Sequence, residues 1–176
     1  MFLESLQGCQ LAIGRYPTFY YDARGGGGEA TLLNSESSHL QKIQFNPNTF
    51  YIPPLNWKTT KILGIPMPPG LEIKMSVDTL QGTIEKATGE IKLDFESRFV
   101  FTMFPSFHFP DLIVKTCLSS GIAKAGLHIA QGKPLQKDGS TKLVGIAVVP
   151  PSGNILLDTF LDLPNEALAI LECKLK

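Results

Sequence analysis

Polar and apolar side chains alternate over residues 90–103, and this alternation constrains the fold more than any other feature of the sequence. Apart from Ser97, the odd positions are apolar: Ile91, Leu93, Phe95, Phe99, Phe101 and Met103. A period of two puts these residues on one face of a β-strand, whereas a helix would spread them around its axis. Because such a strand would extend about 46 Å, longer than most strands, we expect a bend or bulge near Ser97.

The alternating strand is predicted to be one arm of a β-hairpin. The segment 80–95 folds back over residues 86–89, where Gly89 can supply the positive φ that a four-residue loop often requires. This register sets Ile84 opposite Ile91. Because apolar residues then face apolar residues across the pair, the register is internally consistent.

A second hairpin is predicted over residues 142–160, with residues 150–153 as its turn and Val148 opposite Ile155. Both faces of this hairpin are apolar, which indicates a central place in the sheet. Residues 163–171 are the best helix candidate, with Asn165 as its N-cap.

The chain has 176 residues, which suits one domain over residues 1–176. About ten strand signals separated by turn residues predict an all-β fold. We expect an antiparallel β-sandwich or a partly open β-barrel, with at most one short helix near the C-terminus. The formal net charge is zero, and only 18% of the residues are charged. This balance argues against nucleic acid as a partner, because phosphate binding normally needs a basic surface.

Neither the cysteines nor the histidines are spaced like the ligands of a metal site. They are Cys9, Cys117, Cys173, His39, His108 and His128. We therefore expect no metal and no cofactor. The longest apolar run, residues 143–149, is too short to cross a membrane, and the N-terminus lacks the pattern of a signal peptide. These features predict a soluble cytoplasmic protein.

Four consecutive glycines, Gly25, Gly26, Gly27 and Gly28, follow a strand end that carries polar side chains. The tract lacks the Lys-Ser/Thr pair of a phosphate-binding loop. We interpret it as a mobile loop or a wide hairpin connection, with a loop that contacts a ligand or partner as the alternative. The preceding Tyr20, Asp22 and Arg24 are candidates for binding a polar group.

Three apolar loops carry more large side chains than strand periodicity requires: residues 52–57, 65–70 and 104–109. Their candidate binding residues are Trp57, Met67, Phe104, Phe107, His108 and Phe109. Loop phenylalanines either fold back over the core or form an exposed apolar patch, and such patches usually contact a partner or lipid. Together the loops predict an apolar rim around one end of the fold.

Three segments resemble a family of uncharacterised proteins from cyanobacteria with relatives in chloroplasts. They are LQGCQLAIGRYPTFYYDARGGGG at residues 6–28, IPPLNWKTTKILGIPMPPGLEI at residues 52–73 and LVGIAVVPPSGNILLDTFLDLPNEALAIL at residues 143–171. The resemblance implies a photosynthetic source and a location peripheral to thylakoid membranes. It assigns no catalytic residue.

The leading functional prediction is a non-enzymatic binding or assembly module. Its partner would be a hydrophobic small molecule, a lipid, a membrane surface or a protein, contacted through the Gly-rich and Pro/Phe-rich loops. One alternative is a small-molecule enzyme in which Tyr20, Asp22, Arg24 and His108 converge. Another is a structural subunit of a photosynthetic complex. A cavity lined by Phe95, Phe99 and Phe101 would favour a carrier, because a carrier needs an interior that side chains do not fill.

Overall fold

The computed structural model describes residues 1–33 and 39–176. Over these residues the chain forms fifteen strands and one helix. In chain order they are β1 (Phe2–Ser5), β2 (Cys9–Ile13), β3 (Phe19–Tyr21), β4 (Gly27–Leu33), β5 (Leu40–Phe45), β6 (Thr60–Ile62), β7 (Ile65–Pro66), β8 (Leu71–Glu85), β9 (Ile91–Met103), β10 (Phe107–His108), β11 (Leu112–Ser119), β12 (Ile122–Lys124), β13 (Ile129–Gln131), β14 (Ser140–Val149), α1 (Ile155–Leu161) and β15 (Asn165–Leu175). The predicted all-β fold with one short helix near the C-terminus is confirmed.

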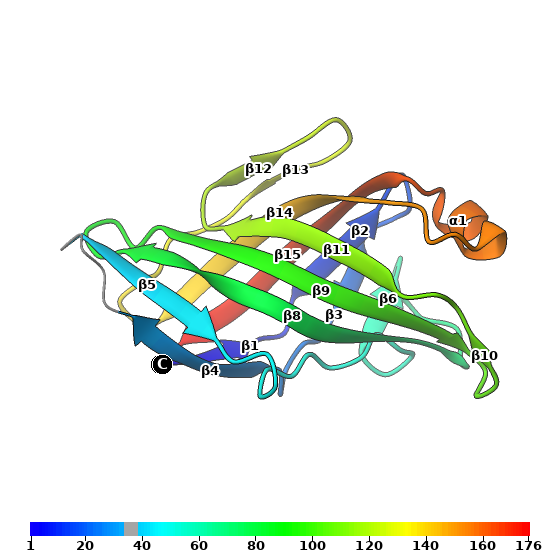
Figure 1. Cartoon of the computed structure of the whole chain (residues 1–176), viewed down its shortest axis with the longest axis horizontal. Helices are drawn as coiled ribbons and strands as arrows, with labels where there is room; N and C mark the ends of the chain where they lie inside the picture. The colour runs from blue at the N-terminus through cyan, green and yellow to red at the C-terminus, as the bar shows by residue number, and fades with distance from the viewer. Residues whose placement is uncertain (34–38) are drawn as a thin grey trace.

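Eight strands form a ring in the order β1, β4, β5, β8, β9, β11, β14 and β15, and pairing of β15 with β1 completes it (Figure 1). All pairings are antiparallel. The backbone pairing between β11 and β14 is limited, because Ser119 and Val144 are the one pair in register between these two strands. The ring is therefore a partly open barrel. Strands β2, β3, β6 and β7 continue the sheet from the N-terminal half of the same β15 edge, where Ala167 to Ile170 pair with β2.

The β8–β9 hairpin has the predicted register. Ile84 lies opposite Ile91, and Gly89 has a φ of 73° in the turn. The expected irregularity lies on the neighbouring strand, between Val77 and Thr79 of β8, directly across from Ser97. Ser97 is fully buried, and its hydroxyl donates a hydrogen bond of 2.8 Å to the carbonyl of Ser76. A small side chain with a hydroxyl is suited to this position beside a bulge.

Residues 155–161 form α1, so the predicted hairpin over residues 142–160 is wrong. The side chain of Asn154 caps the helix by accepting a 3.0 Å hydrogen bond from the backbone N–H of Leu157. Leu157 and Leu161 are four residues apart and both are buried on the same side of α1. This cap and spacing explain why the segment becomes helical.

The predicted helix over residues 163–171 is also wrong, because residues 165–175 form β15. This strand lies between β14 on one side and β1 with β2 on the other. Val148 pairs with Glu166 of β15 and not with Ile155. A strand with neighbours on both edges satisfies its backbone groups along nearly its full length, which outweighs the weak helix signal of a short segment.

A small hairpin, β12–β13, covers the outer face of β14, β15 and β2 (Figure 1). Its Ala130 packs in a cluster with Ala12, Val144 and Leu168. The carboxylate of Glu166 accepts hydrogen bonds of 2.8 Å from the backbone N–H groups of Gly126 and Leu127, at the tip of this hairpin. This cover explains why Val144 and Ile146 of β14 and Leu168 and Ile170 of β15 are apolar although they point away from the barrel interior.

The barrel core is divided into two clusters. One fills the end nearest the β8–β9 turn with large, fully buried side chains, among them Phe45, Leu93 and Leu143. The other surrounds the opposite end, where α1 and β10 lie, and includes Ile73, Phe101 and Leu157 (Figure 1). Packed side chains thus plug the first end, whereas the second end contains an unfilled interior space.

Candidate ligand cavity

An apolar cavity of about 150 Å³ lies inside the barrel at the α1 end. Phe95, Phe99 and Phe101 of β9 line one side of it. Small residues line the facing side: Gly145 and Ala147 on β14, and Ala167 and Ala169 on β15. The space exists because the three aromatic rings face positions where the side chains are too short to fill the interior. Side chains therefore do not fill the interior at this end.

The cavity wall offers almost no polar group to a ligand. Among the described residues that line the wall, Thr116 alone carries a side-chain hydroxyl, and that hydroxyl donates a 2.7 Å hydrogen bond to the carbonyl of Ile146. The Thr116 hydroxyl therefore already has a partner. A cavity of this size lined by hydrocarbon stays dry and can bind a molecule of the size of benzene.

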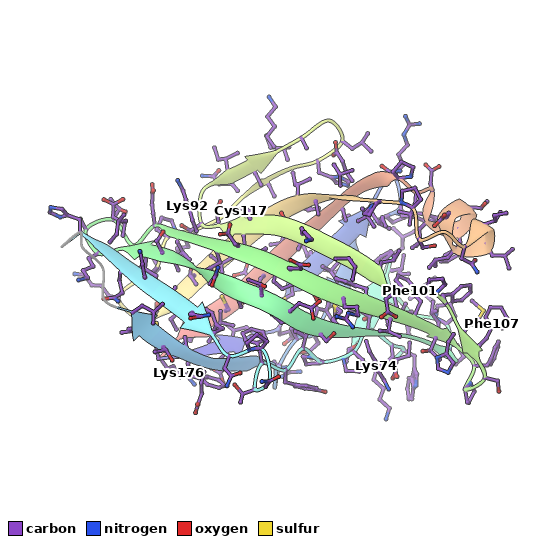
Figure 2. The ribbon with its side chains drawn as sticks, viewed as in Figure 1. Lys74, Lys92, Phe101, Phe107, Cys117 and Lys176 are labelled. Atoms are coloured by element: carbon purple, nitrogen blue, oxygen red, sulfur yellow. The ribbon has the colours of Figure 1, made fainter. Side chains whose placement is uncertain are left out.

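An outer groove of about 470 Å³ adjoins the cavity at the α1 end. Leu71, Phe101 and Phe160 line both spaces, so the groove and the cavity are adjacent and share these three side chains as a boundary. Phe104, Phe107 and Phe109 line the groove from the β9–β10 turn, and Leu156 and Leu157 line it from α1. Figure 2 shows Phe101 partway along β9 and Phe107 at the far end of the β9–β10 hairpin.

The mouth of the groove is surrounded by exposed apolar side chains. Phe104 is 63% exposed, Phe107 is also exposed, and Ile155 at the start of α1 is 83% exposed. Folding back over the core, one of the two interpretations from sequence, is therefore wrong for Phe104 and Phe107, and the exposed apolar patch is confirmed for them. It holds only for half-buried Phe109, whose ring lies edge-on to Phe107 at 5.1 Å between centroids. The reason is that the tight β9–β10 turn projects its residues beyond the barrel wall.

The other two apolar loops contribute differently. Met67 is buried and lines the cavity, and so does Leu55. Gly70 accepts a 2.7 Å hydrogen bond from the backbone N–H of Phe104, which joins two of the loops at the same end of the barrel. Trp57 is exposed outside the cavity, where the ammonium nitrogen of Lys58 lies 5.3 Å from its ring centroid.

The polar candidates do not form one cluster. Asp22 and Arg24 form a two-point ion pair, with 2.6 Å between Nη2 and Oδ2, and this pair holds the pKa of the Asp22 carboxyl below its usual value. Tyr20 is exposed on β3, whereas His108 lies on β10. In the described part of the chain no hydrogen bond or ion pair joins His108 to the other three residues. The geometry therefore gives no support to a shared catalytic site.

The glycine tract is part of the packed barrel, so its interpretation as a mobile connection is wrong. Gly26, Gly27 and Gly28 are buried, and Gly27 begins β4 with a φ of 136°. A Cβ atom at Gly27 would lie 1.8 Å from the carbonyl oxygen of Leu3, and one at Gly28 would meet the ring of Phe50. Only glycine allows β1 and β4 to approach this closely. Gly25 is exposed and has no neighbour within 4 Å of such a Cβ position.

Burial suppresses ionisation of Cys9, Cys173 and Tyr21, the buried groups of the core that could otherwise act as nucleophiles. Desolvation raises the pKa of Cys9 to about 11 and that of Cys173 to about 12. Desolvation also raises the pKa of Tyr21, whose hydroxyl donates a hydrogen bond to the carbonyl of Pro53. These groups stay protonated near neutral pH, so none is an activated nucleophile.

Sequence reasoning missed several residues of the site, including Phe19, Ile62, Phe160 and Leu161. The short side chains at alternate positions of β14 and β15 were a usable signal, because they mark a place where a facing phenylalanine has no bulky partner. Over the described residues no group of three His, Cys, Asp or Glu side chains is arranged to hold a metal ion. Within the same residues, no helix has the length and apolar character needed to cross a membrane.

Comparisons of the chain with protein-family models, with curated proteins and with solved structures find no match. The case for a function therefore rests on the cavity and its surroundings.

Proposed function

We propose that this protein is a non-enzymatic binding module that carries a small hydrophobic molecule inside its barrel. The observation that carries the proposal is the apolar cavity of about 150 Å³ behind Phe95, Phe99 and Phe101. It lies at one end of a barrel whose other end is plugged by packed side chains. Apolar pockets with few polar groups are the usual form of a hydrophobic ligand site.

The energetic cost of the cavity supports this assignment. At about 24 cal/mol per Å³, a void of 150 Å³ lowers the free energy of unfolding by about 3.6 kcal/mol. Folded domains have only about 5–15 kcal/mol of stability in total. A void this expensive is unusual unless something occupies it, and a ligand that fills it would recover much of that free energy.

The test is binding of N-phenyl-1-naphthylamine, a neutral apolar probe whose fluorescence rises in a dry site; its phenyl ring is the size of the cavity, and its naphthyl group would lie in the adjoining groove. Ala147→Leu is the blocking variant, because residue 147 faces the cavity and is 4% exposed. Val148→Leu is the matched control, because the adjacent side chain points outward and is 71% exposed. We expect the wild type and Val148→Leu to bind the probe and Ala147→Leu to lose most of the binding. Equal binding by all three proteins, or none by the wild type, would rule out the cavity as the site.

A second candidate function is contact with a membrane surface, favoured by the exposed apolar residues around the groove. Ile62 lines the cavity. Leu63 follows Ile62 in the chain, Ile65 pairs with Ile62 between β6 and β7, and both Leu63 and Ile65 are exposed. Together with Phe104, Ile155 and Leu156 they form the mouth patch. Contact of this patch with a thylakoid or other membrane would allow the groove to load from the lipid phase. Sedimentation with lipid vesicles tests this role, and Ile155→Ser with Leu156→Ser should reduce binding, whereas Val148→Ser should not.

A further inference from the structure

We infer that the ligand is an amphiphile with a single apolar tail, bound tail first and selected by the length of its tail and not by the charge of its head group. This inference rests on the proposed carrier function and specifies its ligand class. Three observations carry it: the chemistry of the cavity wall, the volume of the cavity, and the position of the outer groove directly beside the cavity.

The cavity wall excludes a polar or charged group from the inner end of the ligand. The hydroxyl of Thr116 is already bonded to the carbonyl of Ile146 at 2.7 Å, and the remaining side chains in the wall are apolar. A hydroxyl or carboxylate placed there would lose its water without gaining a partner, which is strongly unfavourable. The group that enters the cavity must therefore be hydrocarbon.

The cavity volume limits how much of the ligand it can hold. At about 150 Å³ it accepts a group of about six carbon atoms, the size of benzene. A longer tail continues outward past Leu71, Phe101 and Phe160, the three residues that line both the cavity and the groove. The ligand is thus elongated, with its end in the cavity and its middle in the groove.

The groove does not recognise the charge of the head group. Ser106 is the only polar residue among those that line it, and no charged side chain lines the groove or the cavity over the described residues. Among the described residues, the ion pairs closest in the chain to the β9–β10 turn are those of Arg98 with Asp78 and with Asp111. None of these three residues lines the cavity or the groove. The head group therefore remains in water at the mouth, where an acid, an alcohol and a quaternary amine are nearly equivalent.

The experiment is displacement of N-phenyl-1-naphthylamine by three matched series of straight-chain compounds with six to twelve carbons: fatty acids, primary alcohols and alkyltrimethylammonium salts, all below their micelle concentrations. We expect affinity to rise about fourfold per methylene up to a limiting length. At each length the three head groups should differ by less than about threefold. An α,ω-dicarboxylic acid should bind at least about a hundredfold more weakly than the monoacid of equal length, because one charged end would have to enter the cavity.

Ala147→Leu tests where the tail lies. Its three added carbon atoms take about half of a space that holds about six, so the limiting tail length should fall by about three carbons. Val148→Leu should leave the limiting length unchanged. Phe99→Ala enlarges the same cavity and should lengthen the limit, which gives a second readout if Ala147→Leu folds poorly.

Three results would overturn the inference: an affinity that does not depend on tail length, an acid that binds more than about tenfold more tightly than the alcohol, or a dicarboxylic acid that binds as well as the monoacid. Each can occur while the probe still binds the wild type and is still lost in Ala147→Leu, in which case the carrier function stands and only the ligand class is wrong. Failure of the probe itself to bind would contradict both.

Discussion

Filling the cavity should stabilise the protein while it abolishes binding, and Ala147→Leu is the change that tests this trade-off. The substitution adds three carbon atoms to a side chain that is 4% exposed and faces the void. Burial of those atoms contributes about 0.8 kcal/mol each, or about 2.4 kcal/mol. Loss of leucine rotamer freedom costs up to about 1 kcal/mol. The net expectation is a gain of about 1.5 kcal/mol in the free energy of unfolding.

The assay is urea denaturation followed by circular dichroism, with thermal unfolding as a second measurement. A gain of this size should raise the midpoint temperature by about 3–6 °C for a chain of this length. Val148→Leu on the exposed side should change stability by less than about 0.5 kcal/mol. If Ala147→Leu instead loses more than about 1 kcal/mol with an unchanged denaturant slope, the interior has no room for the side chain. The void, and the carrier function argued from it, would then be refuted.

Two further predictions concern the structural supports of the barrel. Hydrogen bonds from backbone N–H groups, chiefly that of Leu127, hold the pKa of Glu166 below its usual 4.5. The contribution of Glu166 to stability is therefore present above about pH 4.5 and is lost as the pH falls through the lower folded-state pKa. Glu166→Gln should speed hydrogen exchange in β12–β13 at neutral pH, and the stability difference between this variant and the wild type should shrink in acid; a difference that does not change with pH would contradict this. Gly27→Ala should destabilise the protein by more than about 3 kcal/mol, because the added Cβ would lie 1.8 Å from the Leu3 carbonyl oxygen. The control Gly25→Ala should cost only about 1 kcal/mol. Equal losses of stability for the two variants in urea denaturation would show that β1 and β4 do not pack this closely.

Local patterns predicted the β8–β9 hairpin well because everything that determines it lies within the segment itself. The alternation around Phe95 assigns the faces, and Gly89 fixes the turn, so no distant residue is needed to set the register. The same reasoning failed for residues 155–161 and 165–175. Both segments are short and rich in leucine, so their composition does not decide between helix and strand. Residues 155–161 become helical because Asn154 caps them, whereas residues 165–175 form a strand because β15 has a neighbouring strand on each edge.

The candidate site was predicted in part for a similar reason. The period of two placed Phe95, Phe99 and Phe101 on one face, and the structure puts all three at the cavity. Whether that face would be covered or left open depended on β14 and β15, which are far along the chain and whose pairing was not predicted. Gly25, Tyr20 and His108 were chosen for their residue types alone, and none of them lines the cavity or the groove.

The two ends of the barrel divide the requirements of stability and binding between them. At the plugged end, large side chains such as Phe45, Ile91 and Leu143 are almost completely buried and support the fold without any ligand. At the α1 end, Phe95 and Phe99 are only half-buried although they point inward, because the space in front of them is unfilled. β11 and β14, which are neighbours in the ring and both line that space, have only the Ser119–Val144 pair in register between them. The part of the wall nearest the cavity is therefore the part least constrained by backbone pairing, and a wall of this kind can adjust to a ligand while the plugged end keeps the barrel folded.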